Sequence, residues 1–299
     1  AENKAMLEFG QAAFGLRFHD WIPLKSKAGG VEGVAFVLPH ATSLAARQQH
    51  RVYLRNMLLT ETADNLLPQW AFFVRCVVNA TDLRPTASRE NFYEDKSLEK
   101  ARNELGGCLR QYIMELADSD KDALRRLIGI HQRSFKALAA EDDEFFKVIA
   151  DLLPFETTQG LLSLGEIRAQ GEIRYAPTVD QFRQIAGVAA AQGLCVVNGG
   201  YVNDTDLIEH VADIYPDVTV EAVDASDVAQ GFEELTSAER DKAFAFLRTA
   251  DDALRAFGCR TELRRFQPTE MPALYSVSRD GEFQRDLERT RESADSLWG

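Results

Sequence analysis

One short polar motif, Ser88-Arg89-Glu90, has side chains that are suited to phosphate chemistry. A guanidinium stays charged at neutral pH and offers a forked set of donors, so Arg89 is a good ligand for phosphate oxygens. The same motif also fits a structural role, in which Ser88 caps the following helix and Glu90 lies near the positive end of its dipole. On the residues alone, the structural capping role is the favoured interpretation.

Other polar residues do not form a known catalytic or metal-binding arrangement. The glycine pairs at 29–30, 106–107 and 199–200 lack the spacing and the Lys or Ser/Thr of a phosphate-binding loop. The five histidines have no metal-binding spacing, and no G-x-S-x-G marks a serine nucleophile. The sequence therefore gives little support for a self-contained hydrolase.

The segment VVNGG at 196–200 is a second place to look, because α/β proteins often bind ligands where a strand ends. A simple turn is the favoured interpretation of the two glycines. A small-molecule enzyme with its site at 198–200 is thus the weakest of the function hypotheses.

Composition narrows the class of protein. The chain has 299 residues, of which 45% are hydrophobic and 27% charged, as in an ordinary globular protein. Its net charge of -13 argues against nucleic acid or an anionic membrane as partner, since both require a basic face. No apolar run reaches the roughly 20 residues of a membrane span, and the start has no secretory leader. We therefore expect a cytoplasmic protein.

The four cysteines are Cys76, Cys108, Cys195 and Cys259, and no two of them form a C-x-x-C pair. Their wide spacing favours reduced, mostly buried thiols over a zinc site or a disulfide framework.

The elements that position Arg89 are predicted from residues 51–90. An apolar run at 51–59 indicates a strand, 61–65 a turn and 68–79 an amphipathic helix, which a polar loop then follows to Glu90. Upstream, the pattern predicts a helix at 3–14, a linker at 23–30, a strand at 33–38 and a mobile loop or short helix at 40–50. A sheet layered with helices is the economical packing for this order.

Downstream of Glu90 the hydrophobic spacing is helical. Three helices are expected between residue 98 and Pro154, separated by polar breaks near 118–122 and 141–143. A second α/β unit then begins, with a mostly parallel sheet and crossover helices. Its expected strands are 173–176, 194–197 and 218–222, and its expected helices are 164–170, 178–191 and 204–214. After a polar break at 228–236, we expect a helix at 237–257, strands at 259–266 and 273–278, and a final helix at 281–297.

Three blocks of sequence, RVYLRNMLL, LLPQWAFFVRCVVNATDL and ASRE, resemble the middle domain of the heat shock protein 90 chaperones, including the bacterial HtpG type. The family has K-L-Y-V-R-R-V-F-I, then P-x-Y-L-x-F-V-R-G-V-V-D-S-x-D-L, then L-N-x-S-R-E. The segment GVEGVAFVLP stands where the family has its E-G-x-x-x-x-x-L-F-I-P strand. The resemblance is strong over 51–90 and weak after about residue 154.

The resemblance implies an ATP-driven, dimeric chaperone that binds unfolded client proteins. In that family an N-terminal domain holds the ATP, and the arginine of the S-R-E motif, here Arg89, contacts its terminal phosphate. The chain then corresponds to the middle domain and the start of the C-terminal domain. Because it begins without Met and inside a predicted helix, we expect a fragment that lacks the nucleotide domain and the dimerisation helices, and that does not hydrolyse ATP alone.

Several positions depart from the family pattern. Tyr93 replaces a Gln four residues after the arginine, Cys76 replaces a Gly, and Pro85 changes the loop before the motif by fixing its own φ and restricting the residue before it. Asp206 stands where HtpG-type proteins have a Trp of the client surface. These departures motivate an alternative, in which the chain is a non-catalytic interaction module without ATP coupling.

The predicted fold class is α/β (α+β overall), in four parts. These are a large layered α/β unit at 1–96, a helical coil at 97–158, a smaller α/β unit at 159–234 and the truncated start of a C-terminal domain at 235–299.

Overall fold

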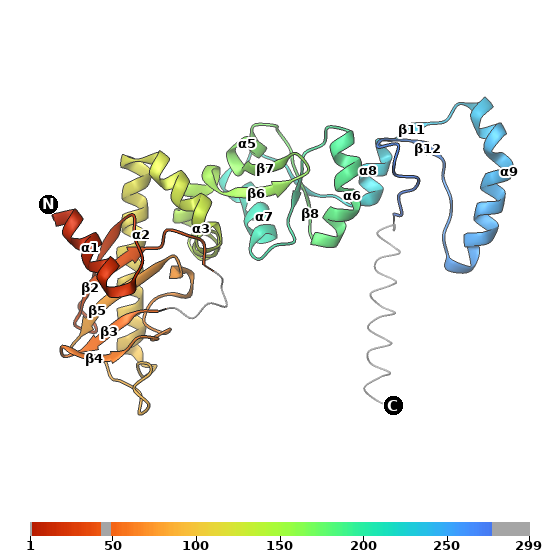
Figure 1. Ribbon diagram of the computed structural model, residues 1–299. Helices are drawn as coiled ribbons and strands as arrows, with labels where there is room; N and C mark the ends of the chain where they lie inside the picture. Colours follow the sequence, from red (N-terminus) through yellow and green to blue (C-terminus); the bar gives the residue numbers. More distant parts are fainter. Residues whose placement is uncertain (1, 43–48, 277–299) are drawn as a thin grey trace, which may run out of the picture. The chain divides into compact units, whose positions relative to one another are not determined.

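The computed structural model describes residues 2–42 and 49–276, and these form two compact units (Figure 1). The first unit consists of the residues up to 154 together with 163–166. The second consists of 155–162 and the residues from 167 onward. Each unit combines helices with a five-stranded sheet, so the predicted α/β (α+β) fold class is confirmed. None of the described helices is both long enough and apolar enough to cross a membrane.

The sheet of the first unit has the strand order β1-β2-β5-β3-β4. Strands β1 and β2 and strands β2 and β5 pair antiparallel, β3 pairs parallel with β5, and β4 pairs antiparallel with β3. The strand bounds are β1 (Trp21–Ser26), β2 (Val31–Val37), β3 (Arg51–Leu54), β4 (Met57–Thr60) and β5 (Val74–Ala80).

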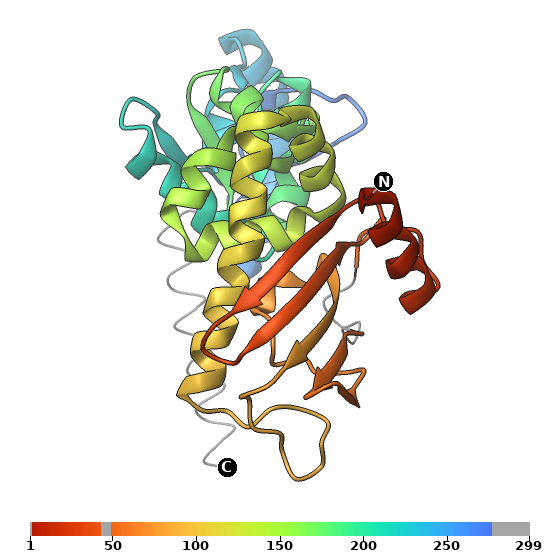
Figure 2. The same ribbon diagram turned by 90° about the vertical axis from the view of Figure 1, so that its left-hand side faces the viewer.

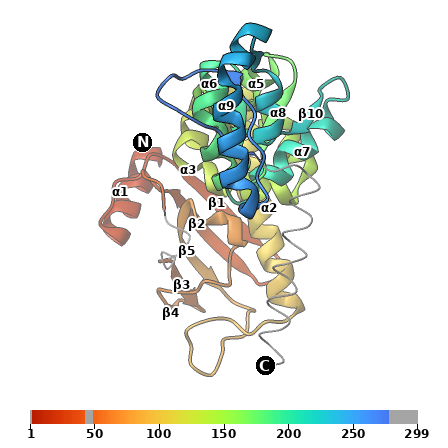
Figure 3. The same cartoon turned by 90° about the vertical axis from the view of Figure 1, so that its right-hand side faces the viewer.

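Helices cover both faces of this sheet, as Figure 3 shows for α1 (Glu2–Phe14) and α2 (Lys96–Ser119). On one face, apolar residues of α1 pack with Phe18, Val34 and Phe36. On the other, Phe73 lies with its ring centroid 5.6 Å from that of Phe135 in α3 (Lys121–Glu141). A short helix, α4 (Asp143–Ile149), and the 3-10 turn η2 (Ala150–Leu152) complete the three helices expected before Pro154. The side chains of Asp95, Asp120 and Asp142 cap the three helices.

The prediction of a helix at 68–79 is wrong. Only the 3-10 turn η1 (Gln69–Ala71) is helical there, and β5 follows from Val74. Along β5, buried and half-buried residues alternate strictly, which is the two-residue period of a strand with one face more deeply buried than the other. The β-branched valines and the pairing with β2 and β3 favour a strand over a helix at these residues.

The other upstream predictions are partly right. The helix at 3–14 and the strand at 33–38 are confirmed as α1 and β2. The predicted linker at 23–30 is half right, because β1 extends over 23–26 and a turn occupies 27–30. The predicted strand at 51–59 is a β3–β4 hairpin, whose turn residues Arg55 and Asn56 have φ of 50° and 66°. Two successive positive φ values are typical of a tight hairpin turn. The predicted segment at 40–50 lies largely outside the described residues.

The sheet of the second unit has the order β10-β8-β9-β6-β7. Strands β10, β8 and β9 are parallel to one another, whereas β6 pairs antiparallel with β9, so the predicted parallel sheet is correct for three strands. The strand bounds are β6 (Pro154–Thr157), β7 (Gly160–Ser163), β8 (Ile173–Ala176), β9 (Val196–Asn198) and β10 (Val220–Ala222). The helices are α5 (Leu164–Arg168), α6 (Val179–Ala191), α7 (Asp204–Ile214) and α8 (Ala225–Gln230), of which the last was not predicted.

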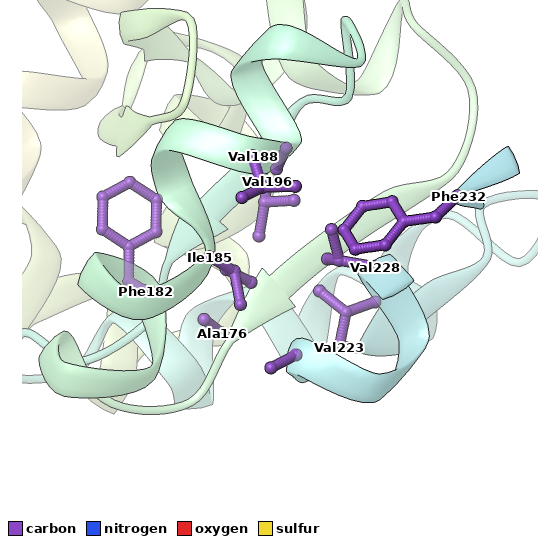
Figure 4. Packing of buried hydrophobic residues seen from close by; sticks show 10 residues of the cluster. Ala176, Phe182, Ile185, Val188, Val196, Val223, Val228 and Phe232 are labelled. Atoms are coloured by element: carbon purple, nitrogen blue, oxygen red, sulfur yellow. The ribbon is translucent and has the colours of Figure 1, made fainter. Parts of the chain in front are cut away.

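The core of this unit lies where α6 and α8 pack on the parallel strands, and Figure 4 shows Ile185, Val188, Val196 and Val228 meeting there. Residues that come later in the chain also pack against this core. Phe266 stacks on Phe232 at 4.6 Å between ring centroids, and Met271 and Leu274 also pack against the cluster.

Helix α9 (Ser237–Leu254) and the turn η3 (Arg255–Phe257) lie in the chain between α8 and the segment with Phe266. Helix α9 has no buried residue. The helix agrees with the prediction for 237–257. The strand predicted at 259–266 shrinks to β12 (Arg264–Arg265), which pairs with β11 (Glu233–Glu234). No strand is found at 273–276, where Leu274 packs against the core and the carbonyl of Tyr275 accepts a hydrogen bond from the side chain of Gln184 in α6. The predicted helix at 281–297 lies outside the described residues.

Candidate functional site

Arg89 lies at the tip of a small hairpin, residues 84–93, which we call the Arg89 hairpin. It belongs to the long segment between β5 and α2, which projects below the first sheet in Figure 2. The side chain of Arg89 is exposed, and it has no hydrogen-bond or ion-pair partner within the described part of the chain. A charged, unpaired guanidinium on a turn is free to bind an anion supplied from elsewhere.

Backbone hydrogen bonds give the Arg89 hairpin a defined shape. The N–H of Tyr93 donates to the carbonyl of Arg84 at 2.7 Å, and the N–H of Thr86 donates to the carbonyl of Asn91 at 2.9 Å. Between these bonds Pro85 and Phe92 face each other as a β-bridge. At the tip, the N–H of Arg89 donates to the carbonyl of Thr86 at 3.1 Å.

The tip holds Arg89 in an uncommon backbone conformation. Its φ is 57°, in the left-handed region, which is unfavourable for a residue with a Cβ atom. The surrounding hydrogen bonds must offset that cost. Hydrophobic anchors on both sides of the tip hold the hairpin, since Leu83 is 4% and Phe92 is 1% exposed. Arg89 therefore lies exposed on a turn that buried residues hold in place.

The capping interpretation of Ser88-Arg89-Glu90 is wrong. Helix α2 begins at Lys96, and Asp95 caps it by accepting hydrogen bonds from the N–H groups of Ser97 and Leu98, both at 2.9 Å. The Ser88 hydroxyl instead lies 3.2 Å from the Thr86 hydroxyl within the hairpin.

The departures from the family pattern have clear places in the hairpin. Tyr93 is 52% exposed, and the guanidinium of Arg84 lies over its ring, 5.0 Å from the centroid. Such a cation–π contact stabilises an exposed pair by roughly 0.5–1 kcal/mol. Pro85 lies in one arm, where its backbone needs no N–H for the ladder. Both residues are compatible with an ordered hairpin.

Residues 198–200 form a packed turn. The side chain of Asn198 donates to Glu156 at 2.7 Å and accepts from the N–H of Gly200 at 3.0 Å. A Cβ atom on Gly200 would lie 2.1 Å from the backbone nitrogen of Val179. Packing therefore accounts for the second glycine, and the turn interpretation has a direct structural basis.

Asp206 lies exposed in the first turn of α7. The loop just before this helix carries two exposed apolar residues, Tyr201 at 52% and Val202 at 75%. Neither Tyr201 nor Val202 belongs to a recognisable sequence motif, so only the structure shows their exposure.

Two histidines of the first unit, His50 and His131, are buried. The side-chain Nδ1 of His50 accepts from the N–H of Cys76 at 3.2 Å, and burial lowers the pKa of His50 to about 4. Burial also lowers the pKa of His131, whose Nε2 lies 2.8 Å from the carbonyl oxygen of Leu38. Both imidazoles have structural partners.

The prediction that the cysteine thiols are mostly buried is wrong. Only Cys76 is buried, and the other three are half-buried, although all four are free thiols. Cys76 faces the covered side of β5, and burial raises the pKa of its thiol. Among the described residues, no group of three or more His, Cys, Asp or Glu side chains is arranged to hold a metal ion.

Comparison with known proteins supports the resemblance seen in the sequence. Residues 38–167 match the model of the family described as Hsp90 protein. The chaperone protein HtpG of Treponema denticola is 29% identical over 108 residues, which are 36% of this chain and 17% of that protein. The HtpG of Nitrosomonas eutropha is 30% identical over 155 residues, covering 47% of this chain and 24% of the relative. For the HtpG of Desulfotalea psychrophila the identity is 25% over 140 residues, covering 47% and 22%.

The matched part thus spans about a fifth of the length of these relatives. The family match includes β3, β4, β5, the Arg89 hairpin and the three helices that follow. On this match, residues 38–167 of the chain are similar to the Hsp90 protein family.

Proposed function

We propose that this chain is the middle part of an ATP-dependent chaperone and that Arg89 contacts the terminal phosphate of ATP held by a separate N-terminal domain. Homology to HtpG chaperones supports the chaperone function. The observation that carries the proposal is the geometry of Arg89, which is exposed and unpaired within the described residues at the tip of an anchored hairpin.

An arginine is well suited to this role. Its guanidinium cannot lose its proton near neutral pH, and its planar donors match two phosphate oxygens at once. As negative charge shifts during phosphoryl transfer, a cation already in place stabilises the transition state more than the bound substrate. Arginines supplied in this way accelerate other nucleotide hydrolases by about 10³–10⁵-fold.

The remaining parts of the proposal follow from the family. The whole protein would be a cytoplasmic homodimer that binds unfolded client proteins, with no nucleic acid or membrane as partner. In the second unit, the exposed Tyr201 and Val202 beside α7 supply apolar surface of the kind that unfolded chains bind. ATP would be the cofactor of the N-terminal domain, and this chain would neither bind ATP tightly nor hydrolyse it.

The second candidate function is a protein-interaction module that keeps the chaperone architecture without ATP coupling. The observation in its favour is the stacking of Tyr93 on Arg84, at the position where the family often uses a Gln to help hold the loop at the nucleotide. The gene sequence ahead of Ala1 is a simple discriminator, because an ATP-binding domain there favours the chaperone and another kind of sequence favours the module.

ATP binding and turnover by this chain and by the full-length protein test the proposal together. We expect no tight binding and no turnover by the chain, and measurable turnover by the full-length protein. Turnover by the chain that is abolished by a substitution within it would contradict the assignment of the ATP site to another domain. A full-length protein that has the domain but no turnover would favour the interaction module.

A further inference from the structure

We propose that Asn65, Glu94 and Arg102 form a positioning network that fixes the Arg89 hairpin in the conformation needed to present Arg89. This inference rests on the proposed function and identifies residues that the sequence motifs do not include. The network joins three separate segments: the turn after β4, the residues just before α2, and α2 itself.

Asn65 pairs with the hairpin as a neighbouring strand would. Its side-chain Nδ2 donates to the carbonyl of Phe92 at 2.8 Å, and its Oδ1 accepts from the N–H of Phe92 at 3.4 Å. Phe92 therefore has the other arm of the hairpin on one side and the Asn65 amide on the other. Because Phe92 is also 1% exposed, this residue is fixed both by packing and by hydrogen bonds.

Arg102 ties Asn65 to helix α2. Its Nε donates to the backbone carbonyl of Asn65 at 2.8 Å, and its Nη2 donates to both carboxylate oxygens of Glu94, at 2.8 and 2.9 Å. The triangle is closed by Asn65, whose Nδ2 also donates to Glu94 at 3.0 Å. A forked donor is required here, since one side chain reaches two different acceptors.

Further hydrogen bonds lead from this triangle to the tip. The N–H of Asp64 donates to the Asn91 side chain at 3.2 Å. The Asn91 carbonyl accepts from both the N–H and the hydroxyl of Thr86, at 2.9 and 3.1 Å. The Thr86 carbonyl then accepts from the N–H of Arg89 at 3.1 Å. A continuous series of contacts therefore connects α2 with the residue that holds Arg89 in its left-handed conformation.

The surface location of the network indicates that it positions the Arg89 hairpin and contributes little to the stability of the whole unit. The side chain of Glu94 is 61% exposed and that of Arg102 is 26% exposed, so the pair lies at the surface and outside the hydrophobic core. The hydrogen bond from Arg102 lowers the pKa of Glu94, which keeps the carboxylate charged. Exposed ion pairs of this kind contribute little to global unfolding. Their loss is expected to act mainly on the hairpin they contact.

The consequence for catalysis follows from how an arginine stabilises a transition state. If the hairpin samples several conformations, the guanidinium is in place for only a fraction of the time, and misplacement by about 1 Å can cost on the order of a hundredfold in rate. Binding of ATP to the other domain does not depend on that placement. A positioning role therefore lowers kcat and leaves KM for ATP unchanged.

The test compares Asn65→Ala, Arg102→Ala and Arg102→Lys with Arg89→Ala in the full-length protein. We expect the two alanine variants to lower kcat about tenfold to a hundredfold at constant KM. Arg102→Lys should retain more activity, because a lysine reaches one acceptor but not both. The matched control is Arg125→Ala, which removes an exposed ion pair with Asp122 on α3 and should leave kcat unchanged.

Amide hydrogen exchange of residues 86–92 in the present chain supplies a readout that does not involve ATP. We expect faster exchange at Thr86, Arg89 and Phe92 in the Asn65 and Arg102 variants, with the rest of the first unit unchanged. If Asn65→Ala fails to fold, the exposed residue Glu94 provides a second variant, Glu94→Ala, with the same expected direction.

The outcomes separate this inference from the function on which it rests. If Arg89→Ala slows turnover while Asn65→Ala and Arg102→Ala do not, the positioning network is refuted and the role of Arg89 stands. If Arg89→Ala has no effect, the proposed function fails, and the exchange experiment still judges the network. Unchanged exchange at residues 86–92 in both network variants would overturn the network in either case.

Discussion

His50 is the residue whose chemistry gives the first unit its clearest pH dependence. Its imidazole is buried, and burial lowers its pKa in the folded state to about 4, against about 6.5 in an unfolded chain. The folded state therefore resists protonation while the unfolded state accepts it. The contribution of His50 to stability is complete above pH 6.5 and is lost as the pH falls from 6.5 towards 4.

We expect the free energy of unfolding of the chain to fall by about 2 kcal/mol between pH 7 and pH 5 because of His50 alone. His131, whose pKa burial also lowers, adds to the same trend. Denaturant unfolding of wild type and His50→Gln at both pH values measures the effect. The variant should show a smaller loss than wild type, and an equal loss in both proteins would contradict the burial effect at His50.

At the residue scale, the resemblance of a short local motif to the family pattern makes Arg89 a candidate, and its role stays a prediction. Asn65 and Arg102 could not be found in this way, since Asn65 contacts Phe92 across 27 positions and Arg102 contacts Asn65 across 37. Neither residue has a spacing that marks it, and only the folded arrangement brings their donors and acceptors together.

At the scale of elements, α2 contains two adjacent glycines with opposite surroundings. A Cβ atom on Gly106 would lie 2.8 Å from Cγ of Pro68, whereas on Gly107 it would meet no atom within 4 Å. Gly106 is buried and Gly107 is exposed. The first glycine allows α2 to approach the turn before β5, and the second has no such role.

Gly107→Ala should therefore stabilise the chain by up to about 1 kcal/mol, because alanine is the better helix former. Gly106→Ala should lose this gain and destabilise the chain, since Pro68 must move. Thermal unfolding of the two variants beside wild type measures the difference, with a rise of about 3 °C expected for Gly107→Ala. Equal shifts for the two variants would show that α2 does not approach Pro68 so closely.

The predicted and observed elements differ where tertiary pairing outweighs local pattern. The long helices α2, α3 and α6 were predicted well, because their apolar residues repeat over many turns. Strand β5 was predicted as a helix, since a short apolar run fits both periods until pairing on both edges decides. The turn at Arg55 and Asn56 was missed because neither residue is a glycine.

At the scale of the whole molecule, the described chain forms two compact units, and the family match ends at residue 167, close to the point where the second unit takes over. The order of elements in the second unit was nevertheless predicted correctly from periodicity alone for α6, β9 and α7. The segment around Phe266 was not, because it packs on the core of the unit without joining its sheet.

In the proposed mechanism, an arginine on one domain contacts a nucleotide that another domain holds. Such an arrangement separates catalysis from binding, because the presenting domain can lose its arginine without changing the pocket that holds ATP. Arg89→Lys keeps the positive charge but loses the fork, so it should fall between wild type and Arg89→Ala in turnover. The exposed control Arg125→Ala should behave as wild type.

The most direct test is the ATP turnover of full-length Arg89→Ala, measured together with its affinity for ATP. We predict that kcat falls by roughly a thousandfold or more while the dissociation constant for ATP changes less than about twofold. Turnover equal to that of wild type would show that Arg89 has only a structural role in the hairpin. It would contradict the account of this site.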